Sequence, residues 1–151
     1  SKLKILQDQV NRWIRDLIVE SNSAASGYNM NESLRGSSSS SYGSILKRAL
    51  LSDVIRFCEF FGLEFTMDLL AQLLTFLNDQ DWELRYAFCE KIASVCVFVG
   101  ASTTSECVLP CIENALYDVE EKVVACAVKC LNSLINLNLL RTLGKSHFCV
   151  F

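Results

Sequence analysis

Apolar residues recur at helical spacing along most of the chain, and short polar breaks separate one run from the next. Residues 3–19 place large apolar side chains on one broad stripe, as in an amphipathic helix that packs against a neighbour. After residue 44 the runs follow one another with hardly a gap. The pattern predicts an all-α fold with further helices at about 44–62, 65–77, 82–99, 104–116 and 119–135.

Residues that begin or end helices stand at the edges of these runs. Ser44 and Asp81 are placed to cap helix N-termini, and Gly62 and Gly100 are placed to end the preceding helices. Pro110 lies early in its helix, where a proline should kink or loosen the first turns because it has no N–H group. Two capping boxes are also predicted, Thr103 with Glu106 and Asp118 with Glu121.

The same pattern of turn and helix occurs more than once. Shifting residues 44–62 by 38 positions onto 82–100 pairs similar residues, and a shift of 39 positions brings a third copy into register. The pairs include Leu46 with Leu84, Lys47 with Arg85, Ala49 with Ala87, Cys58 with Cys96, Phe60 with Phe98, Gly62 with Gly100, Leu77 with Leu116, Asp79 with Asp118, Leu84 with Val123 and Ile92 with Leu131.

A period of this length is typical of HEAT or armadillo repeats, in which each helical hairpin covers the apolar face of its neighbour. The sequence therefore predicts a HEAT-type α-solenoid of about three helical hairpins, with the acidic turn of 78–81 as the corner inside one hairpin. The side chains expected to point inward from the helix at 82–99 are Leu84, Phe88, Ile92, Val95 and Val99.

A stretch rich in Ser, Asn and Gly divides the chain. Residues 21–43 cannot bury enough apolar surface to offset the entropy of ordering, and they are predicted to be a disordered insertion. Residues 1–20 then form the first helix of the array, 44–141 the HEAT repeats, and 142–151 a frayed end or the start of another repeat. Ser37, after Arg35 and Gly36, is either a phosphorylation site or part of a plain solvated loop.

Charge and hydropathy exclude several classes of function. The chain has 151 residues, of which 14 are basic and 17 acidic, and its net charge is −3. Because the basic residues are scattered, the concentrated positive surface that nucleic-acid binding requires is missing. No apolar run approaches the roughly 18–20 residues that span a bilayer. The first residues are too polar for a signal peptide, and the chain is expected to be part of a longer protein.

Eight cysteines lie mostly inside the apolar helical patterns. Cys107 with Cys111, and Cys126 with Cys130, are each four residues apart and share a helix face, so a zinc site could be assembled from them. Disulfides or a reactive thiol are further alternatives. The simplest interpretation is that these cysteines are small buried apolar residues in the reducing environment of the cytoplasm.

Residue types that perform catalysis are sparse. The single histidine, His147, has no positioned partner, and the nearby Cys149 does not make a catalytic dyad by adjacency alone. The glycines form neither a phosphate-binding loop nor a dinucleotide fingerprint. We therefore predict no catalytic, cofactor-binding or metal-binding residue, and no cofactor.

Two remaining features have both a structural and a functional interpretation. The acidic pairs Asp79 with Asp81 and Glu120 with Glu121 are explained by helix capping, with metal binding as the alternative. Trp82 opens a helix beside the corner turn, where it is either a packing residue or a binding hot spot.

Particular phrases within residues 44–141 resemble one known family. They are FCEFFG, TFLNDQDWELR, VFVG and ALYDVEE, in this order and with near-matching spacing. The family is regulatory subunit 4 of the class III phosphatidylinositol 3-kinase complex, and the resemblance is to its central HEAT repeats. Members of this family carry a protein-kinase-like domain before these repeats and a WD-repeat propeller after them. The kinase motifs of the family have no counterpart in this chain.

The resemblance implies a non-catalytic scaffold. Its partners would be the lipid kinase catalytic subunit and a Beclin-type coiled-coil subunit, and the complex would make phosphatidylinositol 3-phosphate for endosomal sorting and autophagy. The location implied is cytoplasmic and peripheral on endosomal or autophagic membranes, with the membrane contacted only indirectly through the complex. The alternative is a generic HEAT or armadillo adaptor of another assembly, such as a phosphatase scaffold or a transport factor.

Overall fold

The computed structural model describes residues 1–26 and 38–140, and the side chains of residues 1–19 and 43–140. These residues are helical apart from short turns, so the predicted all-α fold is confirmed. A 3-10 turn, Thr75–Asn78, extends α3, and a π turn, Thr104–Val108, precedes α5. The α-helices are α1 (Lys2–Ser26), α2 (Ser38–Phe61), α3 (Leu63–Leu74), α4 (Trp82–Thr103), α5 (Leu109–Ala115) and α6 (Glu121–Asn136).

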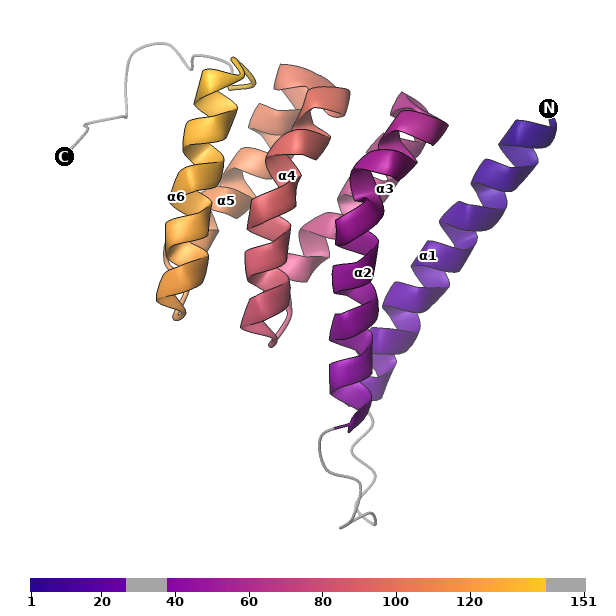
Figure 1. The fold of residues 1–151 in the computed structure, drawn as a ribbon, viewed down its shortest axis with the longest axis horizontal. Helices are drawn as coiled ribbons and strands as arrows, with labels where there is room; N and C mark the ends of the chain where they lie inside the picture. The colour runs from indigo at the N-terminus through magenta and orange to yellow at the C-terminus, as the bar shows by residue number, and fades with distance from the viewer. Residues whose placement is uncertain (27–37, 141–151) are drawn as a thin grey trace.

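The helices pair into the hairpins α1–α2, α3–α4 and α5–α6, which stack side by side (Figure 1). The second helices α2, α4 and α6 form one layer in which each packs against the next, and the first helices form the other layer. The turns inside the hairpins α3–α4 and α5–α6 lie at one edge, which we call the corner edge, and the turns between hairpins lie at the opposite edge (Figure 1). This arrangement is the predicted helical-repeat solenoid.

The core lies between the two layers. All the side chains predicted to point inward from α4 are buried, namely Leu84, Phe88, Ile92, Val95 and Val99. The third hairpin repeats the pattern with Val123, Cys126, Ala127, Cys130 and Leu134 of α6. Each large apolar side chain that is fully buried contributes roughly 1.5–3 kcal/mol. Stacking of hairpins, rather than the helix propensity of any one segment, therefore holds the array together.

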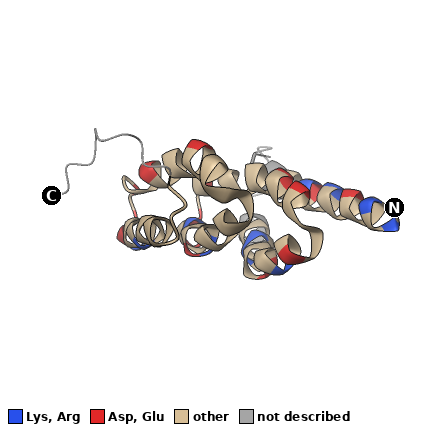
Figure 2. Ribbon diagram, turned by 90° about the horizontal axis from the view of Figure 1, so that it is seen from above, with Lys and Arg blue, Asp and Glu red and all other residues tan. Residues whose placement is uncertain are grey.

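The first helix buries only part of its apolar stripe. Ile14 and Ile18 are buried, whereas Trp13 is 60% exposed. The apolar side chains of Leu3, Ile5 and Leu6 are exposed as well. Helix α1 also carries charged residues of both signs along its length (Figure 2). It packs against α2 and α3, and the described residues provide no helix to cover its other flank.

The predicted disordered segment at 21–43 is wrong at both of its ends. Helix α1 continues to Ser26, and α2 begins at Ser38 rather than at Ser44. Ser44 is buried inside α2, so its predicted role as N-cap is also wrong. Extending an existing helix is easier than nucleating a new one, so serines next to a stable helix can join it. Residues 27–37, which include the candidate phosphorylation site, lie outside the described residues.

Two glycines turn the chain at equivalent places between hairpins. Gly62 and Gly100 have φ angles of 80° and 79°, a left-handed region that residues with a side chain rarely adopt. Gly62 ends α2 as predicted, and Gly100 places a non-helical break inside the continuous run of α4. Four residues further on, the hydroxyls of Thr66 and Thr104 donate to the carbonyls of Gly62 and Gly100, each at 2.8 Å. Both threonines are fully buried, so these bonds satisfy hydroxyls that water cannot reach.

The predicted capping box of Thr103 with Glu106 does not form. Because helical backbone resumes directly after Gly100, Thr103 lies inside the helix and has no free N–H group to cap. Glu106 instead accepts a hydrogen bond from the hydroxyl of Ser102 at 2.8 Å. The π turn at Thr104–Val108 lies immediately before Leu109 and Pro110, where the sequence predicts a loosened helix.

The run Trp82–Ala115 is long and apolar enough to cross a membrane when only length and composition are considered. The backbone of this run is broken at Gly100, and its α4 portion packs against both α2 and α6. We therefore interpret it as the central helix of the array followed by the start of the next hairpin.

Candidate functional site

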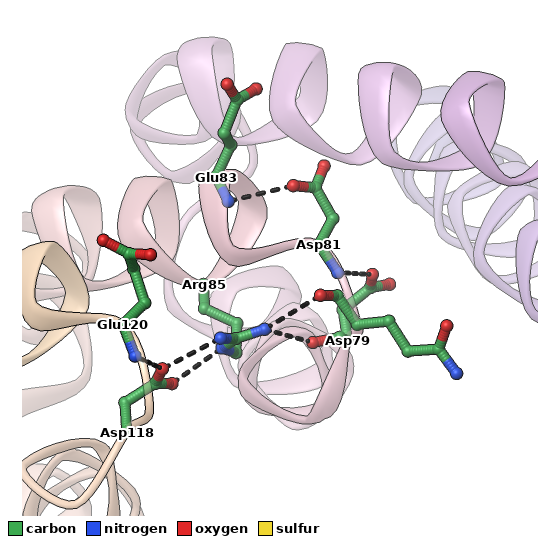
Figure 3. Close-up of polar contacts among 7 residues, drawn as sticks. Asp79, Asp81, Glu83, Arg85, Asp118 and Glu120 are labelled. Carbon is green, nitrogen blue, oxygen red and sulfur yellow. Dashed lines mark hydrogen bonds and ion pairs between the residues drawn. The ribbon is translucent and has the colours of Figure 1, made fainter.

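At the corner edge, a basic residue of one second helix reaches the acidic turn of the next hairpin. Lys47 of α2 pairs with Asp79, with 2.8 Å between Nζ and Oδ2. Arg85 of α4 pairs with Asp118, donating from Nε and Nη2 to the two carboxylate oxygens at 2.7 and 2.8 Å (Figure 3). The two basic residues, and the two aspartates, are repeat equivalents in the sequence alignment. We call these two ion pairs the corner ladder.

Arg85 also binds the corner of its own hairpin. Its Nη1 donates to the backbone carbonyls of Asp79 and Gln80 at 2.9 and 3.1 Å (Figure 3). Only 11% of the Arg85 side chain and 10% of the Asp118 side chain are exposed. A planar guanidinium can make this bidentate pair and still reach the two carbonyls, which a lysine ammonium could not do with the same geometry. Arg85 therefore connects two consecutive corners.

Each ladder aspartate also folds its own turn. Asp79 accepts from the N–H of Asp81 at 3.0 Å, and Asp118 accepts from the N–H of Glu120 at 2.9 Å. Asp81 then caps α4 by accepting from the N–H of Glu83 at 2.9 Å, which confirms the predicted cap (Figure 3).

The predicted capping box of Asp118 with Glu121 is wrong. Glu120 occupies the N-cap position of α6 and makes no side-chain cap hydrogen bond. The oxygens of Asp118 are already engaged by Arg85 and by the N–H of Glu120. The capping interpretation of the acidic pairs therefore holds for Asp81 but not for Glu120. Among the described residues, no group of three or more His, Cys, Asp or Glu is arranged to hold a metal ion.

The buried ion pair shifts the pKa values of both partners. The hydrogen bond from Arg85 holds the pKa of the Asp118 carboxyl below its usual value, although burial opposes this shift. The hydrogen bond to Asp118 likewise raises the pKa of Arg85. The pair therefore keeps both charges at neutral pH and into the acidic range.

The corner ladder fixes the position of one hairpin against the next. Its charges are satisfied inside the protein, and each bond joins two repeats rather than facing a space for a substrate. The repeat alignment pairs Lys47 with Arg85 and Asp79 with Asp118, but the sequence interpretation of the acidic residues was helix capping, with metal binding as the alternative for Asp79 with Asp81. The available signal was a basic and an acidic position that recur together at the repeat distance.

The described cysteines are all free thiols, and most of them are buried. Cys89 and Cys96 of α4 and Cys126 and Cys130 of α6 are buried, and Cys107 is exposed. Burial raises the pKa of Cys96 to about 11 and those of Cys89 and Cys130 to about 12. Cys107, Cys111, Cys126 and Cys130, from which a zinc site could be drawn in the sequence, include no three that are arranged to hold a metal ion among the described residues. Cys149 and His147 lie outside the described residues.

We expect alkylation of the native chain at pH 8 to modify Cys107 rapidly and to leave Cys89, Cys96 and Cys130 unmodified. The thiolate is the reactive form, and a thiol whose pKa is about 11 to 12 is almost entirely protonated at this pH. Peptide mapping by mass spectrometry after iodoacetamide treatment measures each site, and the same reaction in urea is the control that exposes all thiols. Rapid modification of the buried thiols without urea would contradict the packing of α4 against α6.

A groove of about 490 Å³ lies over the layer of second helices. We call it the second-helix groove, and its lining comes from three helices. The lining residues are Arg48 of α2, then Trp82, Glu83 and Tyr86 of α4, then Lys122, Ala125, Cys126 and Lys129 of α6. Trp82 packs against the core, as one interpretation predicted, and it also lines this groove. An open groove of this kind can receive a partner, but it contains no nucleophile paired with a base.

Comparison with known proteins identifies the region of a larger protein to which this array corresponds. The family model described as "PIK3R4-like, middle domain" matches residues 1–149. A Dictyostelium discoideum protein described as a probable serine/threonine-protein kinase vps15 is 47% identical over 97 residues, which are 64% of this chain and 5% of that protein. The Arabidopsis thaliana serine/threonine-protein kinase VPS15 is 44% identical over 97 residues, 64% of this chain and 6% of the relative.

A third relative, from Candida glabrata, is described as a non-specific serine/threonine protein kinase. It is 36% identical over 104 residues, which are 68% of this chain and 7% of the relative. The chain thus spans between 5% and 7% of the length of these three relatives. The region matched by the family model is the middle domain and not the kinase domain.

Proposed function

Because the chain belongs to the PIK3R4-like family and matches its middle domain, we propose that it is a non-catalytic HEAT-repeat scaffold segment of the regulatory subunit of the class III phosphatidylinositol 3-kinase complex. The observation that carries this proposal is the family match over residues 1–149 together with a solenoid whose polar groups stabilise the stack. A stacked array of hairpins presents long surfaces and is a common platform for other proteins.

The partners in this proposal are the lipid kinase catalytic subunit and a Beclin-type coiled-coil subunit. The complex makes phosphatidylinositol 3-phosphate in endosomal sorting and autophagy, and the protein is peripheral on those membranes. The segment contributes a rigid spacer between other domains of the regulatory subunit rather than a reaction of its own. Its rigidity is supported by the corner ladder and by the buried threonine bonds at the glycine turns.

We expect the full-length protein to bring down phosphatidylinositol 3-kinase activity in a pull-down, and a version lacking residues 44–141 to bring down far less. The assay measures conversion of phosphatidylinositol to its 3-phosphate by the bound material. A matched control is the full-length protein with Asp53→Ala, which alters a residue that is exposed on α2 and should change nothing.

Limited proteolysis of the deletion variant shows whether its remaining domains stay folded. Lipid kinase activity with the full-length protein but not with a folded deletion variant supports the scaffold. If neither version brings down activity, a generic HEAT adaptor is the better account. Activity that survives the deletion would place the essential contact outside these repeats.

A further inference from the structure

The second-helix groove has a local charge opposite to that of the whole chain. Its lining contains the cations Arg48, Lys122 and Lys129 and the single acid Glu83, so its net charge is 3 − 1 = +2. The chain as a whole has a net charge of −3. Arg48 is already paired with Glu83. The positive charge that remains therefore belongs to Lys122 and Lys129 of α6.

Neighbouring charges do not cancel this excess. Glu90 of α4 lies near Cys126 of the groove, and it pairs with Lys91 at 3.7 Å. Within the described residues, neither Lys122 nor Lys129 forms an ion pair with an acidic side chain. Both lysines are exposed, so a carboxylate from outside could reach them.

The groove also offers aromatic surface beside these charges. The ammonium of Lys122 lies 4.7 Å from the centre of the Trp82 ring, which holds the lysine over the groove. Tyr86 lies one turn further along α4, and both rings are only partly buried. Tryptophan and tyrosine in partly covered grooves contribute strongly to protein binding, because they bury large areas and lose little entropy.

We propose that the second-helix groove binds an acidic peptide segment of a protein partner, with carboxylates paired to Lys122 and Lys129 and an apolar side chain against Trp82 and Tyr86. This inference deepens the proposed scaffold function, because it assigns one contact surface of the scaffold. It rests on the proposed function in one respect, namely that the molecule bound in the groove is a protein.

The spacing of the lysines restricts the segment. Lys122 and Lys129 are seven residues apart on one helix, about 10 Å along its axis. Two acidic residues seven positions apart in a helical peptide share one face and span about 10 Å as well. In an extended peptide side chains alternate between faces, so the matching acidic residues would be two or four positions apart, about 7 or 13 Å.

A peptide fits this surface better than a membrane does. The groove is bounded by side chains of α2 on one side and α6 on the other, whereas a bilayer surface requires cations on an accessible edge or a flat face.

The test is selection from a library of random peptides displayed on phage, using the 151-residue chain as bait. We expect the selected peptides to carry two acidic residues at one of these spacings, next to a large apolar residue. The double variant Lys122→Glu with Lys129→Glu should bind the selected peptides at least about tenfold more weakly, as two lost ion pairs and two repulsive ones imply. Trp82→Ala should weaken binding of the same peptides without changing their salt dependence.

The matched control is Arg12→Glu with Arg15→Glu, which makes the same change of charge on the exposed face of α1 and should leave peptide binding unchanged. Circular dichroism verifies that every variant is folded. Selection that yields no peptides, yields peptides without acidic residues, or yields peptides that bind the reversed variant equally well overturns the proposal. So does binding to phosphatidylserine vesicles that needs the two lysines while no peptide is selected. The lipid kinase pull-down repeated with the double variant distinguishes the two proposals, because activity that still comes down while no peptide is selected leaves the scaffold standing and overturns only the groove.

Discussion

Replacing Asp118 with alanine should lower the free energy of unfolding by about 3 kcal/mol, because removing one partner of a buried pair leaves the other charge uncompensated. Arg85 would keep its guanidinium in a site where its side chain is 11% exposed, and the turn before α6 would lose the bond to the N–H of Glu120. Urea denaturation followed by circular dichroism at pH 7 measures the change.

A matched control is Asp53→Ala, which breaks the exposed pair of Asp53 with Arg56 and should cost no more than about 0.5 kcal/mol. The double-mutant cycle of Arg85→Ala with Asp118→Ala isolates the coupling between the two partners. If Asp118→Ala costs no more than Asp53→Ala, the corner ladder does not stabilise the stack.

The same variant should also change the response to acid. The pKa of Asp118 is lowered in the folded state, so its contribution to stability is fully present above the unfolded value of about 3.9. That contribution is lost as the pH falls from this value through the lower folded pKa. The difference between the natural chain and Asp118→Ala should therefore shrink when the urea midpoints are compared at pH 7 and at about pH 3. A difference that grows on acidification would contradict the lowered pKa.

Replacing Phe88 with alanine should cost about 4 kcal/mol, since truncating a fully buried phenylalanine removes its apolar burial and leaves a cavity. Phe88 is 0% exposed and lies on α4, the helix that packs against both α2 and α6. Urea denaturation is again the measurement. Loss of the cooperative unfolding transition would also agree with this expected destabilisation.

Phe60→Ala provides the matched control, because Phe60 lies on α2 and is 63% exposed. Its substitution should change the free energy of unfolding by well under 1 kcal/mol. A similar cost for both substitutions would mean that α4 is not the central helix of the core.

The pattern of apolar residues was sufficient to predict the helices and their stacking. The inward side chains of α4 and the glycine at the end of α2 are where the period and the turn chemistry place them. Such features depend on local sequence and on burial, which recur in every repeat.

Polar contacts between repeats were harder to predict. The ion pair of Arg85 with Asp118 joins residues 33 positions apart, and local rules assign each of them to its own helix. The hydroxyl of Thr104, and not that of Thr103, donates a hydrogen bond to the carbonyl of Gly100. The turn at Gly100 determines which of the two threonines faces this carbonyl. The preference of serine for N-caps predicts a helix start at Ser44, whereas the structure places this residue inside α2.

Consecutive hairpins are joined at both edges of the array. At the edge opposite the corners, the chain itself passes through Gly62 or Gly100, and at the corner edge an ion pair closes the gap. If consecutive hairpins were joined at one edge only, they could separate at the opposite edge. Because the hairpins are joined along two sides, bending that separates the corners requires breaking an ion pair of the corner ladder. The corner ladder therefore stiffens the stack against bending that would separate consecutive corners.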